Sequence, residues 1–183
     1  MLVIHPKDRT TAFLSALYDG ADNADVINEN ISRADLNHRL YHTSKCERIL
    51  LLGHGGDKGL FWRKDDTEPG FDGIVLGHPH SYHLRNHGSN IIAVFCNADK
   101  FAQEEHLHGL FTGMIISEMS EAEEYGIETS EKEIECENRK FVERLRSLLE
   151  GNVSLCDIPQ RMLEMDDSHS PLTEFNYHRI YFV

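Results

Sequence analysis

The chain has 183 residues, 40% of them hydrophobic and 27% charged, a composition that is ordinary for a folded globular protein and argues against disorder along its whole length. This length is about that of one domain, and we expect a single domain over residues 1–183. The formal net charge of −13 argues against binding to nucleic acid or to an anionic membrane surface, because both need basic side chains.

We expect neither a targeting segment nor a membrane-spanning segment in this sequence. No apolar run approaches the ~20 residues of a transmembrane helix, and the first residues lack the pattern of a signal peptide. The four cysteines form no CxxC pair, which argues against a disulfide framework or a cysteine-bound zinc ion. We therefore expect a cytoplasmic protein with free thiols that uses neither a metal nor a cofactor.

Strands are predicted at short apolar runs between turns, and helices where apolar residues recur at helical spacing. The first half of the chain predicts a strand at 2–4, a helix at 10–18, a strand at 25–27, a helix at 32–42 with Ser32 as N-cap, a strand at 49–52, and a hairpin of 59–62 with 73–76. The second half predicts a short helix at 80–86, a strand at 90–95, a helix at 101–108, a strand at 111–116, a long helix from the capping box at 130–133 to Gly151, and a last strand within 175–183. This alternation predicts an α/β sandwich of three layers around a mainly parallel sheet.

Two of the buried strands are followed by residues that can carry chemistry. The strand at 49–52 leads into His54 and Gly55, and the strand at 90–95 leads into Cys96. If these strands are parallel neighbours, ~4.8 Å apart, both side chains lie at the sheet edge where α/β proteins bind ligands. The imidazole can then take the thiol proton during nucleophilic attack, and the N–H groups of Gly55 and Cys96 can stabilise an oxyanion.

The blocks Ile49-Leu-Leu-Leu-Gly-His54-Gly-Gly and Ile91-Ile-Ala-Val-Phe-Cys96-Asn resemble the signature of the caspase-like (clan CD) cysteine peptidases, which include caspases, legumains, gingipains and bacterial CHAT-type domains. The likeness covers residues 48–118. It implies a six-stranded sheet of order 2-1-3-4-5-6, a catalytic dyad of His54 and Cys96, and an oxyanion hole at Gly55 and Cys96. The implied function is hydrolysis of a peptide or protein substrate.

The chain departs from this family at several positions. Phe95 precedes the cysteine where many members have a small residue, and Val94 stands where caspases have the glutamine that binds an acidic side chain. Asp8 and Arg9 lie near the place of the caspases' specificity arginine and form the predicted substrate pocket. Because the chain is short for a peptidase with a full substrate cleft, a catalytically inactive binding or regulatory module of the same fold is the alternative.

A histidine-rich segment allows a different interpretation. His78, His80, His83 and His87 lie within ten residues, and the last two have the i, i+4 spacing that zinc sites use on a helix. The segment contains no HExxH motif, and Pro79 interrupts its regularity. A solvent-exposed histidine-rich segment accounts for the pattern without a metal.

The residues near the predicted dyad also have more ordinary interpretations. Residues 53–56 form a glycine-rich turn, but they lack both GxGxxG and a Walker lysine. Asp57 is a candidate to orient the histidine. Glu118 and Glu121 are either part of a cleft wall or solvated acids. A cysteine such as Cys96 at the end of an apolar strand is, taken alone, usually a small buried hydrophobe.

Overall fold

The computed structural model describes residues 1–68 and 70–183. The strands are β1 (Leu2–Ile4), β2 (Asp25–Ile27), β3 (Ile49–Leu52), β4 (Gly55–Gly56), β5 (Gly59–Trp62), β6 (Gly73–Gly77), β7 (Ile91–Val94), β8 (Gly109–Thr112) and β9 (Ile180–Phe182). The α-helices are α1 (Arg33–His42), α2 (Ser81–Leu84), α3 (Ala98–Glu105), α4 (Met119–Tyr125), α5 (Glu131–Glu150), α6 (Ile158–Glu164) and α7 (Pro171–Tyr177). Short 3-10 helices are η1 (Ala12–Leu17), η2 (His78–His80) and η3 (Arg85–Asn90).

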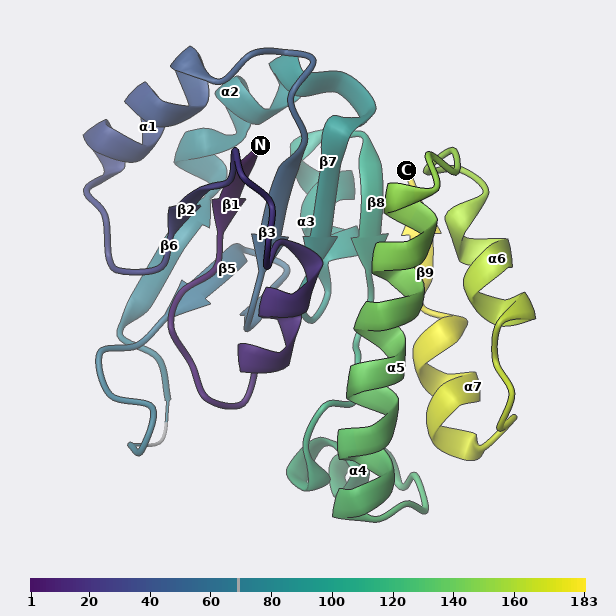
Figure 1. Ribbon diagram of the computed structural model, residues 1–183. Coiled ribbons are helices and arrows are strands. Elements are labelled where there is room, and N and C mark those ends of the chain that lie inside the picture. The colour runs from purple at the N-terminus through teal and green to yellow at the C-terminus, as the bar shows by residue number, and fades with distance from the viewer. Residues whose placement is uncertain (69) are drawn as a thin grey trace.

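The main sheet has six strands in the order β2-β1-β3-β7-β8-β9 (Figure 1). Its first five strands are parallel, and β9 runs antiparallel to β8, so the sheet is mixed. A small antiparallel sheet, β4-β5-β6, follows β3 in the chain and contains the predicted hairpin. The predicted α/β class is confirmed.

Helices cover both faces of the main sheet. Successive side chains of a strand point to opposite faces, so in β3 Ile49 and Leu51 enter one core while Leu50 and Leu52 enter the other. The first core is completed by α1, α2 and α3, and the second by η1, α5 and α6. All four β3 residues are buried because helices cover both sides of the strand.

The predicted helices with clear start signals form where expected. The Ser32 Oγ accepts a hydrogen bond from the Asp35 N–H (3.1 Å) at the start of α1, and the Ser130 Oγ accepts one from the Glu133 N–H (3.3 Å) at the start of α5. The 20-residue α5 lies along the second face of the sheet (Figure 1). Within the described residues, no helix combines the length and the apolar character that crossing a bilayer requires.

The predicted strand at 175–183 is wrong in its first half. Its first three residues belong to α7, and only Ile180–Phe182 form β9. The helix begins there because the Ser170 Oγ accepts a hydrogen bond from the Thr173 N–H (3.3 Å), and Pro171 occupies the first helical turn. Serine as N-cap followed by proline is a standard helix start, so the sequence contained this signal.

Two other predicted elements lie nearer the N-terminus than expected. The helix predicted at 101–108 starts at Ala98, because Asn97 (φ 59°) turns the chain, and it ends before His106 (φ 53°). The strand predicted at 111–116 is β8, which starts at Gly109. A side chain at Gly109 would place Cβ 2.2 Å from the Ile91 carbonyl oxygen, so a glycine is needed for β8 to pair with β7 at this point.

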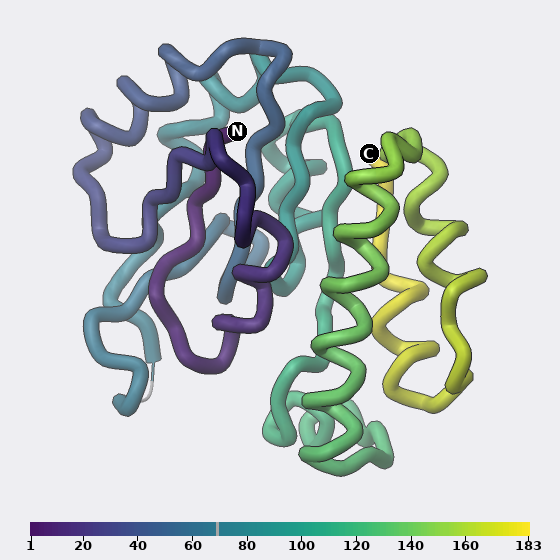
Figure 2. Tube along the Cα trace, viewed as in Figure 1, coloured from purple at the N-terminus to yellow at the C-terminus, as the bar shows by residue number. Residues whose placement is uncertain are grey.

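The predicted helix at 10–18 is also shorter and tighter than expected. It is the 3-10 helix η1, in which the Tyr18 N–H donates to the Ser15 carbonyl (2.9 Å). In Figure 2 the purple segment between β1 and η1 turns below the sheet, on the side toward which the parallel strands β1, β3 and β7 run. The turn after β1 therefore lies close to the residues that follow the central strands.

Candidate functional site

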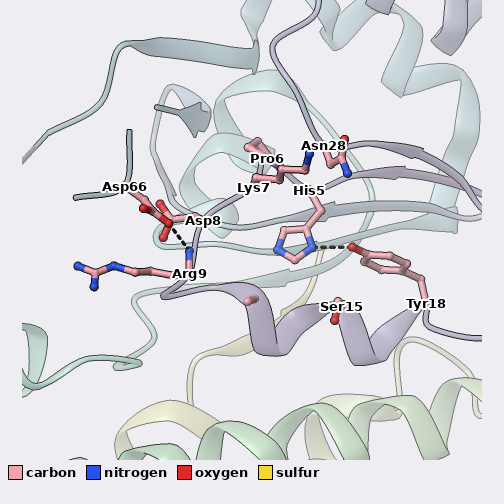
Figure 3. Close-up of a pocket in the computed structure, with 10 residues that line it drawn as sticks. His5, Pro6, Lys7, Asp8, Arg9, Ser15, Tyr18, Asn28 and Asp66 are labelled. Atoms are coloured by element: carbon pink, nitrogen blue, oxygen red, sulfur yellow. Dashed lines mark hydrogen bonds between the residues drawn. The ribbon is translucent and has the colours of Figure 1, made fainter. Parts of the chain in front are cut away.

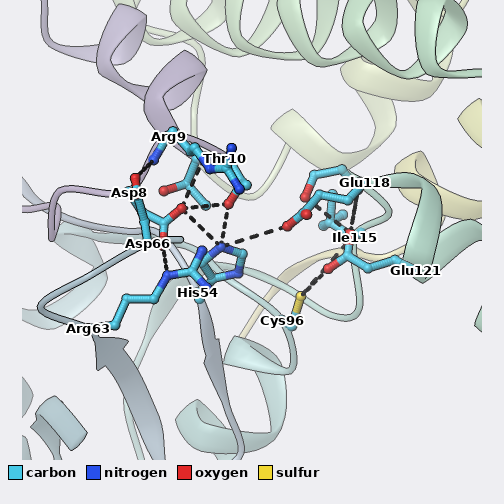
Figure 4. Close-up of polar contacts among 12 residues, drawn as sticks. Asp8, Arg9, Thr10, His54, Arg63, Asp66, Cys96, Ile115, Glu118 and Glu121 are labelled. Atoms are coloured by element: carbon cyan, nitrogen blue, oxygen red, sulfur yellow. Dashed lines mark hydrogen bonds and ion pairs between the residues drawn. The ribbon is translucent and has the colours of Figure 1, made fainter. Parts of the chain in front are cut away.

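His54 and Cys96 follow neighbouring strands at matching positions. Leu52 of β3 pairs with Val94 of β7, and the Gly53 N–H donates to the Val94 carbonyl (3.1 Å), which extends the ladder past the end of β3. His54 and Cys96 each stand two residues after this last pair of the ladder. Figure 4 shows both side chains at this edge. Within the described part of the chain, the sulfur contacts Ile115 and Glu121, and no hydrogen bond joins it to His54.

A chain of hydrogen bonds holds the His54 ring from the side of the turn after β1. The His54 Nε2 lies 2.7 Å from the Thr10 Oγ1, and that hydroxyl lies 2.6 Å from the Asp8 Oδ1. The Asp8 Oδ1 is itself 3.6 Å from the His54 Nε2. On its other oxygen, Asp8 accepts a hydrogen bond from the Arg63 Nε at 2.5 Å. His54 is therefore fixed at the Nε2 end of its ring (Figure 4).

Asp8 is ionised in this arrangement. Its side chain is only 6% exposed, and burial alone would raise the pKa of the carboxyl group. Hydrogen bonds from Arg63, from the Thr10 hydroxyl and from the Thr10 N–H (3.0 Å) outweigh burial and lower the pKa of Asp8 from 3.8 to about 2. Asp8 thus carries a negative charge at neutral pH and accepts hydrogen bonds without donating any.

Cys96 has a different environment. Its sulfur lies 3.8 Å from the Ile115 carbonyl oxygen and 3.9 Å from the Glu121 Oε1. Burial, followed by the negative charge of Glu121, raises the pKa of the Cys96 thiol from 9.0 to about 12. At neutral pH the thiol is therefore protonated in the resting protein.

The two glutamates that follow β8 approach the two halves of the predicted dyad. The Glu118 Oε1 is 3.9 Å from the His54 Nε2, which is too long for a hydrogen bond. The Glu121 Oε2 accepts hydrogen bonds from the N–H groups of Ser117 (2.6 Å) and Glu118 (3.1 Å), and in this way caps the start of α4. Burial raises the pKa of Glu121. Glu121 is thus a structural residue and not a solvated acid.

Gly55 makes room for Phe95. A Cβ at Gly55 would lie 2.3 Å from the Phe95 Cδ2, and Phe95 is buried between the two strand ends. The Phe61 N–H donates to the His54 carbonyl (2.8 Å), so the next pair of the ladder, Gly55 with Leu60, is not hydrogen-bonded. The Gly55 N–H therefore points away from β5, as a donor to an oxyanion would have to do.

The structure separates the roles of the two residues predicted to form a substrate pocket. Asp8 and Arg9 both line a pocket of about 340 Å³ (Figure 3). The Arg9 side chain is exposed, and its backbone N–H donates to the Asp66 Oδ2 (2.9 Å). Both oxygens of Asp8, in contrast, are already engaged by Arg63 and Thr10. The Arg9 side chain is accessible to a ligand, whereas Asp8 holds the His54 ring in place through Thr10.

A second pocket, of about 510 Å³, includes Thr10 and Glu118, which both approach His54. Its lining comes from the turn after β1, from the start of α4 with the two residues before it, and from the first turns of α5. Its acidic lining residues are Glu118, Glu131 and Glu135, against the single basic residue Arg9. Glu118, which lies near the His54 ring, connects this pocket to the site.

The other patterns in the sequence have structural explanations. The expectation of a solvent-exposed segment holds for His78, whose side chain is 83% exposed, and is wrong for His80 and His87, which are buried. His80 Nδ1 accepts the Gly77 N–H (3.1 Å), and His87 Nε2 donates to the Leu40 carbonyl (3.2 Å). Across residues 1–68 and 70–183, no three His, Cys, Asp or Glu side chains converge on a metal position. Asp57 does not orient His54, because its side chain is exposed and pairs with Lys58.

Comparisons with protein-family models, with curated proteins and with solved structures gave no match for this chain. The interpretation of the site therefore rests on its own residues and their geometry.

Proposed function

We propose that this chain is a caspase-like cysteine peptidase domain in which Cys96 is the nucleophile and His54 is the base. The observation that carries the proposal is the matched position of the two residues, which follow adjacent parallel strands at the same sheet edge. The architecture supports it too. When the small β4-β5-β6 sheet is left aside, the six strands of the main sheet stand in the order 2-1-3-4-5-6, and the small sheet directly follows His54.

The environment of Cys96 favours one of two known ways to activate a thiol. A thiol pKa of about 12 disfavours a preformed thiolate–imidazolium pair in the resting enzyme. The proton instead moves to His54 as the bond between sulfur and the peptide carbonyl carbon forms. The imidazolium then returns that proton to the leaving amine, and a water molecule, deprotonated by His54, releases the acid product and restores the thiol.

The same geometry provides for the charge that develops on the peptide oxygen. The Gly55 N–H, which points away from β5, and the Cys96 N–H are the proposed oxyanion donors, as the family resemblance implies. Phe95 packs where a Gly55 side chain would be, so it fixes the position of the Gly55 backbone relative to the β7 end. The 510 Å³ pocket beside Glu118 has room for a side chain of a peptide substrate.

One observation favours a second candidate, a catalytically inactive binding module of the same fold. Cys96 is turned toward Ile115 and Glu121, and a carboxylate next to a thiol opposes formation of the thiolate. A module of this kind would bind a peptide at the same edge without cleaving it.

Hydrolysis of a mixed peptide library, followed by mass spectrometry, separates the two candidates. The peptidase predicts new termini with the native protein and none with Cys96→Ala or His54→Gln. Cys156→Ala is the matched control, since Cys156 is an exposed free cysteine 60 residues after Cys96 in the sequence, and it should leave cleavage unchanged. Cleavage that persists in Cys96→Ala refutes the proposed nucleophile. Peptide binding without cleavage by the native protein favours the binding module.

A further inference from the structure

The Asp8–Thr10–His54 chain of hydrogen bonds contains enough information to assign the proton on the histidine. A threonine hydroxyl has one hydrogen and can donate it to only one partner. The Thr10 Oγ1 has two close partners, the Asp8 Oδ1 at 2.6 Å and the His54 Nε2 at 2.7 Å. The assignment therefore depends on which partner receives the hydroxyl hydrogen.

Asp8 decides this question. Its carboxylate is buried and bound to the Arg63 guanidinium, and it also accepts the Thr10 N–H, so it is held in the ionised form. An ionised carboxylate has no hydrogen to donate. The Thr10 hydroxyl must then donate to Asp8, and toward His54 it presents only a lone pair. A short contact between that lone pair and Nε2 requires a hydrogen on Nε2.

We infer that Asp8 and Thr10 fix neutral His54 in the tautomer with the hydrogen on Nε2, which leaves Nδ1 as the nitrogen that receives the Cys96 proton. This inference rests on the proposed function and adds Thr10 and Asp8 to it as positioning residues. In the step itself, the Cys96 S–H bond breaks and the Nδ1–H bond forms. The sulfur electron pair makes the bond to the carbonyl carbon, and the C=O π pair moves to the oxygen. The Nε2–H stays on the ring throughout.

The surroundings of the ring agree with this assignment. Among the described residues, no hydrogen bond engages Nδ1, whereas Thr10, Asp8 and Glu118 all lie within 4 Å of Nε2. After proton transfer, the positive imidazolium lies 3.6 Å from the Asp8 Oδ1, so the buried carboxylate stabilises the charge that forms. While the His54 ring is neutral, the positive charge of the Arg63 guanidinium balances the negative charge of the Asp8 carboxylate.

The test is long-range ¹H–¹⁵N NMR of protein labelled with ¹⁵N-histidine, at a pH where the ring is neutral, with His54→Gln identifying the His54 signals. We expect the native protein to show Nε2 protonated and Nδ1 unprotonated. A hydrogen on Nδ1 overturns the inference. This readout does not depend on turnover, so it stays decisive even if no peptide is cleaved and the proposed function fails.

Two Thr10 variants then test the hydroxyl. Thr10→Val keeps the shape and removes the lone pair, so we expect His54 to populate both tautomers and kcat to fall at least about tenfold, within the range that general-base catalysis provides, with little change in KM. Thr10→Ser keeps a hydroxyl and should restore both the single tautomer and kcat. A pure Nε2–H tautomer in folded Thr10→Val shows that Thr10 does not set the proton position. If that variant does not fold, the native spectrum together with Thr10→Ser decides.

Discussion

The two halves of the site differ in how well the resting protein prepares them. The His54 half is fixed through Thr10 to a buried, ionised aspartate, while the Cys96 half presents a protonated thiol to a carboxylate. Under the proposed function, a base that is held in place and a nucleophile that is kept uncharged would require proton transfer and attack to occur together. The Cys96 thiol would then stay unreactive until a substrate binds.

The largest effect is expected from a substitution that disturbs the contact between the His54 loop and the residues that precede Cys96. Gly55→Ala would place a methyl group 2.3 Å from Phe95 and 2.7 Å from the Gly59 carbonyl oxygen, so Phe95 or the strand must shift. We expect a loss of about 2–3 kcal/mol in the free energy of unfolding, measured by urea denaturation, together with loss of peptide cleavage. Gly56→Ala is the matched control, because its nearest contact is the tip of Phe61 at 3.1 Å and the cost should be smaller. Equal losses in both variants contradict this account.

Lowering the pH should reduce the free energy of unfolding, because it protonates Asp8, which holds His54 through Thr10. The pKa of Asp8 is about 2 in the folded protein, below its ordinary 3.8, so the folded form holds this proton less tightly than the unfolded form. The resulting stabilisation, about 2 kcal/mol, is complete above a pH of about 4 and disappears as pH falls toward about 2.

Urea unfolding at a series of pH values checks this prediction, with Asp8→Asn expected to lose that part of the pH dependence. Asp25→Asn is the control, since Asp25 pairs with Arg39 at the surface, where an ion pair contributes less than about 1 kcal/mol. An identical pH dependence of native protein and Asp8→Asn shows that the Asp8 charge does not stabilise the fold.

In the Cys96 half of the site, Glu121→Gln should lower the pKa of the Cys96 thiol and so make the thiol more reactive. The amide removes the negative charge beside the sulfur, and glutamine can still cap a helix start. We expect iodoacetamide to alkylate Cys96 about tenfold faster, corresponding to a fall of about one unit in the thiol pKa. The measurement uses a background in which the other three cysteines are serine. Glu123→Gln, an exposed change on the same helix, is the control, and an unchanged rate in Glu121→Gln assigns the suppression to burial alone.

The smallest expected effect concerns the charge of the substrate. The 510 Å³ pocket beside the site has three acidic residues and one basic residue in its lining. Among peptides that the protein cleaves, those with a lysine should be cleaved a few times faster than matched peptides with a glutamate, and added salt should reduce the difference because it screens exposed charges. Glu135→Gln should narrow the preference, and a preference that salt leaves unchanged argues against an electrostatic origin.

The sequence predicted that His54 and Cys96 follow neighbouring strands, but it did not predict the residues that hold the His54 ring. His54 and Cys96 were recognisable because each directly follows a fully apolar strand, and parallel neighbours end at one edge. Thr10 is 44 residues before His54 and lies in the irregular turn between β1 and η1, so periodicity says nothing about its side chain. The available signal was indirect: β1 is also a neighbour of β3, which brings the turn after β1 to the same edge.

The elements were predicted where local signals are strong. Ser32 and Ser130 mark their helices through capping contacts that depend only on nearby residues. The role of Asp8 depends instead on Arg63, 55 residues away, which binds the carboxylate and turns a predicted substrate contact into a buried anchor. Contacts of this kind follow from how loops cross in space, and a single sequence does not encode them in any short pattern.

Phe95 has one more consequence for how the site can move. Its buried ring lies against the Gly55 backbone, and Phe95 itself follows β7, so moving the His54 loop away from the Cys96 loop would leave a cavity in the interior. Rotation of the Cys96 side chain away from Glu121 moves the sulfur without opening such a cavity. Under the proposed function, a peptide would bind to a backbone that is already in place, and only the Cys96 side chain would have to rotate.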